Sequence, residues 1–254
     1  MIPFFRKIRK KMADDNKPIK YLRYAIGEIV LVMIGILLAL QVNNWNQNRI
    51  KFNESIKHLK SLKYDLEVDT IYFNQQKRES QKQVDNYRIF FKKSYETQNN
   101  IEEVTELIDL AYPLTNYLQV QKSTFSEMVN AGKLNDLANE ELKSSIVALY
   151  RDYEIARLSN RDYNEYTVSL MEGLKFNIWK FLSGNRENLF DEEYMFHDND
   201  WKFLNDYSST KFQQFENMVT QYHGKQSDAI EMFDELKIKA SLLIKEINDE
   251  LNSH

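Results

Sequence analysis

The sequence contains few of the residues that end helices and form turns. Its 254 residues include six Gly and three Pro, with no Gly between Gly35 and Gly132 and no Pro between Pro18 and Pro113. Folds built from strands need frequent turns, and turns draw heavily on these two residue types. The scarcity of both predicts an all-α fold.

Cysteine is absent, which excludes disulfides, thiolate metal sites and cysteine nucleophiles. Charge is divided unevenly along the chain. Residues 1–24 carry eight Lys and Arg against two Asp, whereas the remaining residues carry 26 Lys and Arg against 36 Asp and Glu. A nucleic-acid platform needs a cationic face to neutralise phosphates, so the acidic body predicts no nucleic-acid partner.

One long apolar run is present, from Tyr21 to Val42. A helix of these 22 residues is about 33 Å long, enough to cross a hydrocarbon layer of about 30 Å. The alternative is a cleaved signal peptide, but the length of the run and the absence of a small-x-small exit favour an uncleaved signal anchor. We predict a cytoplasmic basic amphipathic segment at 1–20, a transmembrane helix at 21–44 and an extracytoplasmic helical domain at 45–254.

The charge distribution predicts the orientation of this helix. Lys and Arg accumulate on the cytoplasmic side of a membrane span, and here the basic cluster precedes the apolar run. Trp45, among Asn and Gln residues, is typical of an aromatic anchor at the far headgroups. We therefore expect a bacterial inner-membrane protein with its amino terminus in the cytoplasm and its carboxy-terminal domain in the periplasm.

Within the apolar run, Glu28, Leu31, Gly35 and Ala39 fall on one helix face. Gly35 and Ala39 form a small-x-x-x-small pair, which lets helices approach closely. Glu28 has two compatible interpretations: it reaches the nearby headgroups and basic residues, or it faces a protein partner. We predict a transmembrane association face, with a second copy of the chain or another envelope protein as its partner.

The stretches FFRKIRKKM and KYLRYAIGEIVLVMIGILLALQVNNWN closely resemble the amino-terminal signature of a family of bacterial single-pass membrane proteins that is classed as a domain of unknown function. The stretch STFSEMVNAGKLNDLANEELKSSIVALYRDYE is similar to a second block of such proteins. The resemblance implies an inner-membrane protein with an all-helical external domain. It implies no activity.

Beyond the apolar run, three long seams of apolar residues recur at a seven-residue period. Such seams are typical of helices packed in a bundle. The first seam is formed by Phe52, Leu59, Leu66, Phe73 and Tyr87 and is interrupted at Ser80, and the other two include Asn160 and Gln226. We expect an elongated antiparallel bundle that continues from the transmembrane helix, with its first helix extending to about Tyr95.

The breaks between these seams predict the remaining boundaries. We expect a short helix at Ile101–Ala111, a second that begins with a Thr124–Glu127 capping box, and long helices from Asn139 to Gly184 and from Ser208–Thr210 onward. If neighbouring helices run antiparallel, the turn between Gly184 and Tyr207 faces the membrane.

That turn is unusually rich in aromatic residues. One interpretation is an apolar plug that closes the end of the bundle. The other is a contact loop for lipid headgroups or a partner protein, with Phe190, Tyr194, Phe196 and Trp201 as its contact residues.

Patterns that indicate catalysis or cofactors are lacking. None of the four His has a Glu three residues before it, as di-iron bundles require, so we expect no metal and no cofactor. Gly224-Lys225-Gln226-Ser227 echoes a phosphate-binding loop, but Val219 replaces the required first Gly. We expect a non-enzymatic protein that acts by binding, as a scaffold or accessory subunit of an envelope complex. The alternatives are a sensor that signals through its transmembrane helix and, last, a hydrolase.

Overall fold

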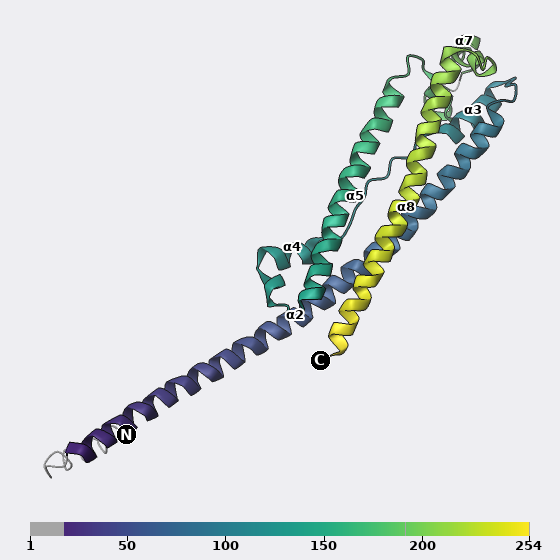
Figure 1. The fold of residues 1–254 in the computed structure, drawn as a ribbon. Coiled ribbons are helices and arrows are strands. Elements are labelled where there is room, and N and C mark those ends of the chain that lie inside the picture. Colours follow the sequence, from purple (N-terminus) through teal and green to yellow (C-terminus); the bar gives the residue numbers. More distant parts are fainter. Residues whose placement is uncertain (1–17, 191, 254) are drawn as a thin grey trace. The chain divides into compact units, whose positions relative to one another are not determined.

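The computed structural model describes residues 18–190 and 192–253, and the chain divides into two compact units, residues 1–57 and 58–254. Within the described residues every regular element is helical, which confirms the all-α class (Figure 1). The elements in chain order are α2 (Pro18–Lys93), α3 (Ile101–Ala111), α4 (Ser123–Asn130), the 3-10 helix η1 (Lys133–Asp136), α5 (Glu140–Glu172), η2 (Ile178–Phe181), α6 (Ser183–Asn188), η3 (Glu193–Met195), α7 (Asp198–Trp201), η4 (Lys202–Asn205) and α8 (Thr210–Asn252).

The first unit is helical from Pro18 onward and contains the predicted span at 21–44. Residues 1–17 of the predicted amphipathic segment, which was expected at 1–20, lie outside the described residues. Apolar side chains of the span, from Leu22 to Val42, are exposed.

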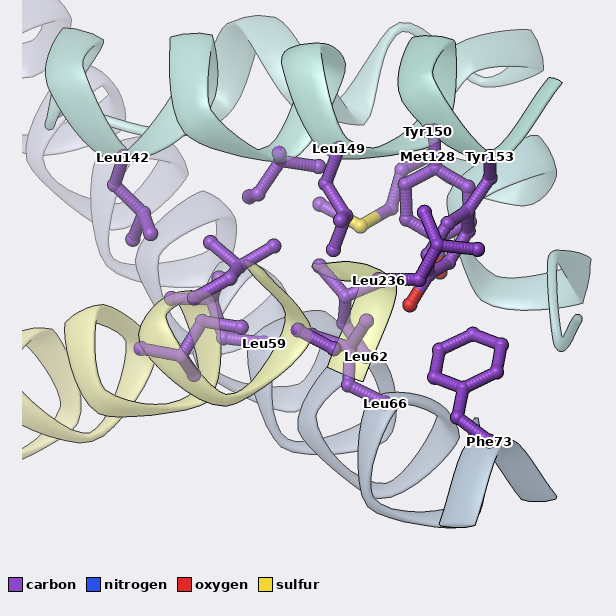
Figure 2. Packing of buried hydrophobic residues seen from close by; sticks show 14 of the residues in the cluster. Leu59, Leu62, Leu66, Phe73, Met128, Leu142, Leu149, Tyr150, Tyr153 and Leu236 are labelled. Carbon is purple, nitrogen blue, oxygen red and sulfur yellow. The ribbon is translucent and has the colours of Figure 1, made fainter. Parts of the chain in front are cut away.

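In the second unit, α8 runs antiparallel to α2 and α5. One core cluster lies where the last turns of α8 pack against α2 and α5. In this unit α2 and α5 each contribute their first turns to the cluster (Figures 1 and 2). Its members include Leu59, Leu62, Leu66, Phe73, Leu142, Ile146, Tyr153, Phe233, Leu243 and Ile247. Fully burying one Leu or Phe side chain stabilises the fold by about 1.5–3 kcal/mol, so the predicted apolar seams hold the three helices together.

A second core cluster closes the other end of this unit. It joins the end of α2, near Phe90, with α3, η2 and the beginning of α8, near Phe215. The ring centroids of Phe90 and Phe215 are 5.6 Å apart, in an edge-to-face arrangement. The long helices therefore share one apolar layer at each end.

Side-chain caps fix three of the predicted helix starts. Asn100, Asn139 and Ser209 each accept a hydrogen bond from the backbone N–H three residues later, at the beginnings of α3, α5 and α8. Such a bond satisfies one of the donors that the first turn of a helix leaves unpaired. The predicted starts of these helices are confirmed.

Two predicted features of the shorter elements are wrong. α4 begins at Ser123, so Thr124 lies inside the helix, and its hydroxyl is not positioned to cap it. α5 ends at Glu172, where the N–H of Gly173 bonds to the carbonyl of Ser169, and not at Gly184. The apolar residues after Gly173 continue the seam pattern in sequence, but Ile178 and Phe181 enter the second core cluster from a 3-10 helix.

The predicted position of the aromatic turn is also wrong. After α3 the chain returns as an extended segment, residues 112–122, and places α4 and η1 beside the beginning of α5 (Figure 1). Eleven extended residues cover roughly 36 Å, so this segment replaces a descending helix. The turn after α5 therefore packs with Phe90 and α3, at the end of the unit where α2 terminates.

Candidate functional site

The first unit presents an apolar helix surface. An 18-residue window within Ala25–Lys93 has a mean hydropathy of 2.4, and none of it is buried. By length and composition this helix is able to cross a membrane, and it is compatible with a signal anchor or a signal sequence. A continuous apolar surface of this kind marks contact with lipid or with another protein.

The four residues of the predicted association face lie on this helix. Glu28, Leu31, Gly35 and Ala39 are spaced three and four residues apart, so they share one face. A side chain built at Gly35 meets no atom within 4 Å, which leaves the backbone open to close approach by another helix. Association through this face stays a prediction.

The structure separates the four residues of the predicted contact loop. Trp201 is 6% exposed and belongs to the second core cluster, as the plug interpretation expects. Phe196 is half-buried beneath the guanidinium of Arg186, and its ring centroid lies 6.3 Å from that of Phe190. Tyr194 is 72% exposed. A partner contact stays a prediction, with Tyr194 as its most accessible residue.

The middle of the second unit is polar, and its polar side chains bind the extended segment 112–122. Tyr72 donates from its hydroxyl to the carbonyl of Tyr117 (2.7 Å) and accepts from the N–H of Gln119 (3.3 Å). From α5, the Oδ1 atom of Asn160 accepts from the N–H of Leu118 (3.1 Å). A buried backbone group needs a partner, and here side chains supply it.

The same segment is held from α5 and α8 at further points. Asn164 donates to the carbonyl of Asn116 (3.0 Å), and Lys225 and Gln226 both donate to the carbonyl of Leu114 (3.1 and 2.7 Å). The polar interruptions of the seams at Asn160 and Gln226 are therefore among the positions that bind the segment. This arrangement fixes the segment among the three long helices.

Asp69 is a buried carboxyl group beside this segment. It is 1% exposed, and its Oδ1 atom accepts the N–H of Gln121 (2.8 Å). Burial raises the pKa of Asp69 to about 7; the nearby Asp65 reinforces this rise, whereas the N–H of Gln121 and the hydroxyl of Tyr153 oppose it.

Two lysines are buried in the second unit, and their surroundings differ. Lys180 is 9% exposed, forms an ion pair with Asp200 and donates to the carbonyl of Met195 (3.1 Å). Although burial opposes ionisation of Asp200, the bond from Lys180 and the N–H of His197 lower the pKa of that carboxyl group. Lys180 thus follows the rule that buried charges are paired.

Lys225 departs from that rule. It is 3% exposed, and its Nζ atom donates to the carbonyl of Leu114. No carboxylate in the described part of the chain forms an ion pair with it. Burial lowers the pKa of Lys225 to about 8, because the charged form loses hydration without gaining a counter-charge.

Lys225 also lines a groove of about 350 Å3 between α5 and α8. Ala156, Ala229 and Met232 make its apolar wall. Polar side chains border the rest: Ser159, Asn160, Tyr163, Lys225 and Asp228. The groove therefore combines a buried cation, hydroxyl and amide groups, an exposed carboxylate and an apolar surface.

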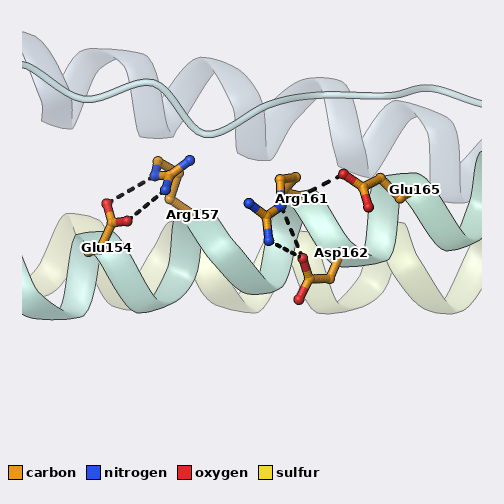
Figure 3. A network of polar contacts seen from close by, with 5 residues as sticks. All are labelled: Glu154, Arg157, Arg161, Asp162 and Glu165. Carbon is orange, nitrogen blue, oxygen red and sulfur yellow. Dashed lines mark hydrogen bonds and ion pairs between the residues drawn. The ribbon is translucent and has the colours of Figure 1, made fainter.

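The outer face of α5 carries a row of charged side chains that, unlike Lys225, are paired with one another near the surface. Glu154 pairs with Arg157 (2.6 Å), and Arg161 pairs with Asp162 (2.8 Å) and Glu165 (3.7 Å) (Figure 3). The five side chains are exposed or half-exposed, so water screens the pairs and they contribute little to stability. We interpret this row as a solvated helix face.

Residues 18–190 and 192–253 contain no group of three or more His, Asp or Glu arranged to hold a metal ion.

A family of unknown function, DUF6090, matches residues 28–194. The chain belongs to this family. No curated protein and no solved structure matches the chain.

The DUF6090 match begins at Glu28, inside the apolar run, and ends at Tyr194. It includes α3, α4, α5 and the extended segment. α8, which supplies Lys225 and Asp228, lies after the matched region. The groove is therefore formed by one helix of the DUF6090 region and one helix that follows it.

The sequence prediction missed Lys225 and Asp69. A signal for Lys225 is present, since it lies three residues after Tyr222 and four before Ala229, on the apolar face of α8. A charged residue at such a spacing indicates a buried cation. The sequence gives no comparable signal for the missing counter-charge, because the surroundings of Lys225 come from α5 and the extended segment.

Proposed function

We propose that this protein is anchored in the bacterial inner membrane by the apolar part of α2 and acts by binding, as a scaffold or accessory subunit of an envelope complex. The exposed apolar surface of the first unit carries this proposal. Insertion into a lipid bilayer would remove this surface from water, and the basic residues that precede it favour an amino terminus in the cytoplasm and a periplasmic body.

The proposal includes a partner within the membrane. Glu28, Leu31, Gly35 and Ala39 offer a face on which small residues permit close helix contact. A second copy of this chain or another envelope protein is the proposed occupant. Nothing in this role requires catalysis or a cofactor.

In-cell photocrosslinking of the full chain from Gly35 tests the proposal. We expect the protein in the membrane fraction at its full length, resistant to carbonate extraction, with its body digested by protease added to spheroplasts. We expect a protein crosslink from Gly35. The matched control is a photoreactive residue at Met33, which lies about 200° around the helix from Gly35 and should capture lipid.

Recovery of a shortened, soluble protein would show that the apolar segment is a cleaved signal sequence and would overturn the anchor. Lipid capture from both positions would leave the anchor intact and overturn the association face.

A second candidate function is a ligand-binding sensor that passes its signal to a separate output protein. The groove at Lys225 favours it, because a buried cation that lacks a counter-charge is a feature of binding sites more than of structural cores.

A further inference from the structure

We propose that the groove between α5 and α8 binds a small zwitterion with an apolar body, of the class of the apolar α-amino acids, and that Lys225 binds its carboxylate. The proposal extends the second candidate function. It depends on the groove alone and is independent of the membrane anchor.

The first step is the charge of Lys225. Among the described residues, Lys180 is buried to a similar degree and has Asp200 as its counter-ion. In the part of the chain that the structure describes, Lys225 has one acceptor, the carbonyl of Leu114, which leaves two of its three N–H donors for a ligand. A carboxylate placed beside it would accept a charge-assisted hydrogen bond in a site with little water.

The second step is the polar border of the groove near this cation. The Oδ1 atom of Asn160 is used by the N–H of Leu118 and by Asn164 (3.1 and 3.4 Å). Its Nδ2 atom makes no hydrogen bond to any of the described residues, so it remains a donor. Lys225 and Asn160 come from the two facing helices and supply two donors to one carboxylate.

The third step is the opposite charge. Asp228 is exposed at the border of the same groove, one helical turn from Lys225. A purely anionic ligand would be repelled by this carboxylate, whereas a ligand with an ammonium group gains from it. Ala156, Ala229 and Met232 then favour an apolar remainder. The volume of about 350 Å3 is within the range of small-ligand sites.

Isothermal titration of the full chain in detergent with each of the twenty protein L-amino acids tests this inference. We expect at least one apolar amino acid to bind. Its carboxamide analogue, which lacks the carboxylate, should not bind, and its deaminated analogue should bind more weakly. In the Asp228→Asn variant, which lacks the carboxylate proposed to bind the ammonium group, the amino acid and its deaminated analogue should bind about equally well.

Lys225→Met should weaken the binding of that amino acid by about tenfold or more. This substitution replaces a buried charge with an apolar side chain of similar length, and circular dichroism checks that the variant folds. Lys245→Met, at an exposed lysine of the same helix, is the matched control and should leave binding unchanged.

If Lys225→Met fails to fold, Ser159→Leu provides a second test, because Ser159 is exposed at the border of the groove and a larger side chain there should block the ligand. Absence of binding by all twenty amino acids would overturn the inference. Binding that is unchanged in Lys225→Met, or in Ser159→Leu where that variant is used, would also overturn it. Neither result would affect the membrane anchor, which fractionation tests separately.

Discussion

Asp69 shows how a single residue makes the stability of this fold depend on pH. Its pKa is about 7 in the folded chain, against an ordinary value of 3.8. The folded state therefore holds the proton more tightly than the unfolded state between these two values. The contribution of Asp69 to stability is therefore fully present below its ordinary pKa and is lost as the pH rises through 7.

We expect Asp69→Asn to stabilise the protein at about pH 8 by about 1–3 kcal/mol, because the amide avoids a buried negative charge and keeps an oxygen for the N–H of Gln121. The advantage should vanish near pH 4, where the carboxyl group of Asp69 is protonated in the folded state. Chemical denaturation across this pH range measures the effect.

Glu79→Gln is the control, since Glu79 is an exposed carboxylate on the same helix. This change should leave the pH dependence unaltered. An advantage of Asp69→Asn that is equal at both pH values would contradict the assignment of the pH dependence to Asp69.

At this scale the sequence predicted the apolar residues well and the polar ones poorly. Leu59, Leu66 and Phe73 were expected in a seam, and all three are buried. Ser80, Asn160 and Gln226 were visible as interruptions, but the sequence did not show that Asn160 and Gln226 bind the backbone of 112–122. That function depends on a segment that has no periodicity of its own.

At the scale of elements, the extended segment 112–122 is the part of the fold that helix periodicity did not predict. We expected neighbouring helices to run antiparallel, and this expectation placed the aromatic turn at the wrong end of the bundle. The reason is that a short extended segment can cross the length of a bundle as well as a longer helix can. The end of α5 was missed for a related reason, since Ile178 and Phe181 are buried outside the long helix.

We expect the hydrogen bonds to this segment to stabilise the bundle. Tyr72→Phe removes one hydroxyl that donates to Tyr117 and accepts from Gln119 and leaves the ring in place. The expected loss is about 1–2 kcal/mol in the free energy of unfolding. Amide hydrogen exchange should show faster exchange of the Gln119 N–H.

Tyr64→Phe provides the matched control, because Tyr64 lies on the same helix and is 66% exposed. This variant should be as stable as the parent. Equal exchange of the Gln119 N–H in the parent and Tyr72→Phe would mean that this contact does not hold the segment in solution.

At the scale of the whole molecule, the division into two units separates two physical roles. Residues 1–57 contain the apolar surface, whereas both core clusters consist of residues from Leu59 onward. The sequence predicted a change of character after residue 44, at the end of the apolar run. The compact unit begins later, at His58. Its boundary depends on which residues reach the core, and not on where the sequence changes from apolar to polar residues.

This division predicts that residues 58–254 fold without the preceding segment. All three long helices supply core residues within this range, and the caps at Asn100, Asn139 and Ser209 are retained. We expect the truncated chain to be soluble and helical, and to unfold in one cooperative transition at the temperature at which the body of the full chain unfolds in detergent. Circular dichroism and sedimentation measure both properties. A truncated chain that unfolds at a much lower temperature would show that residues before His58 stabilise the body, and that the two units fold as one.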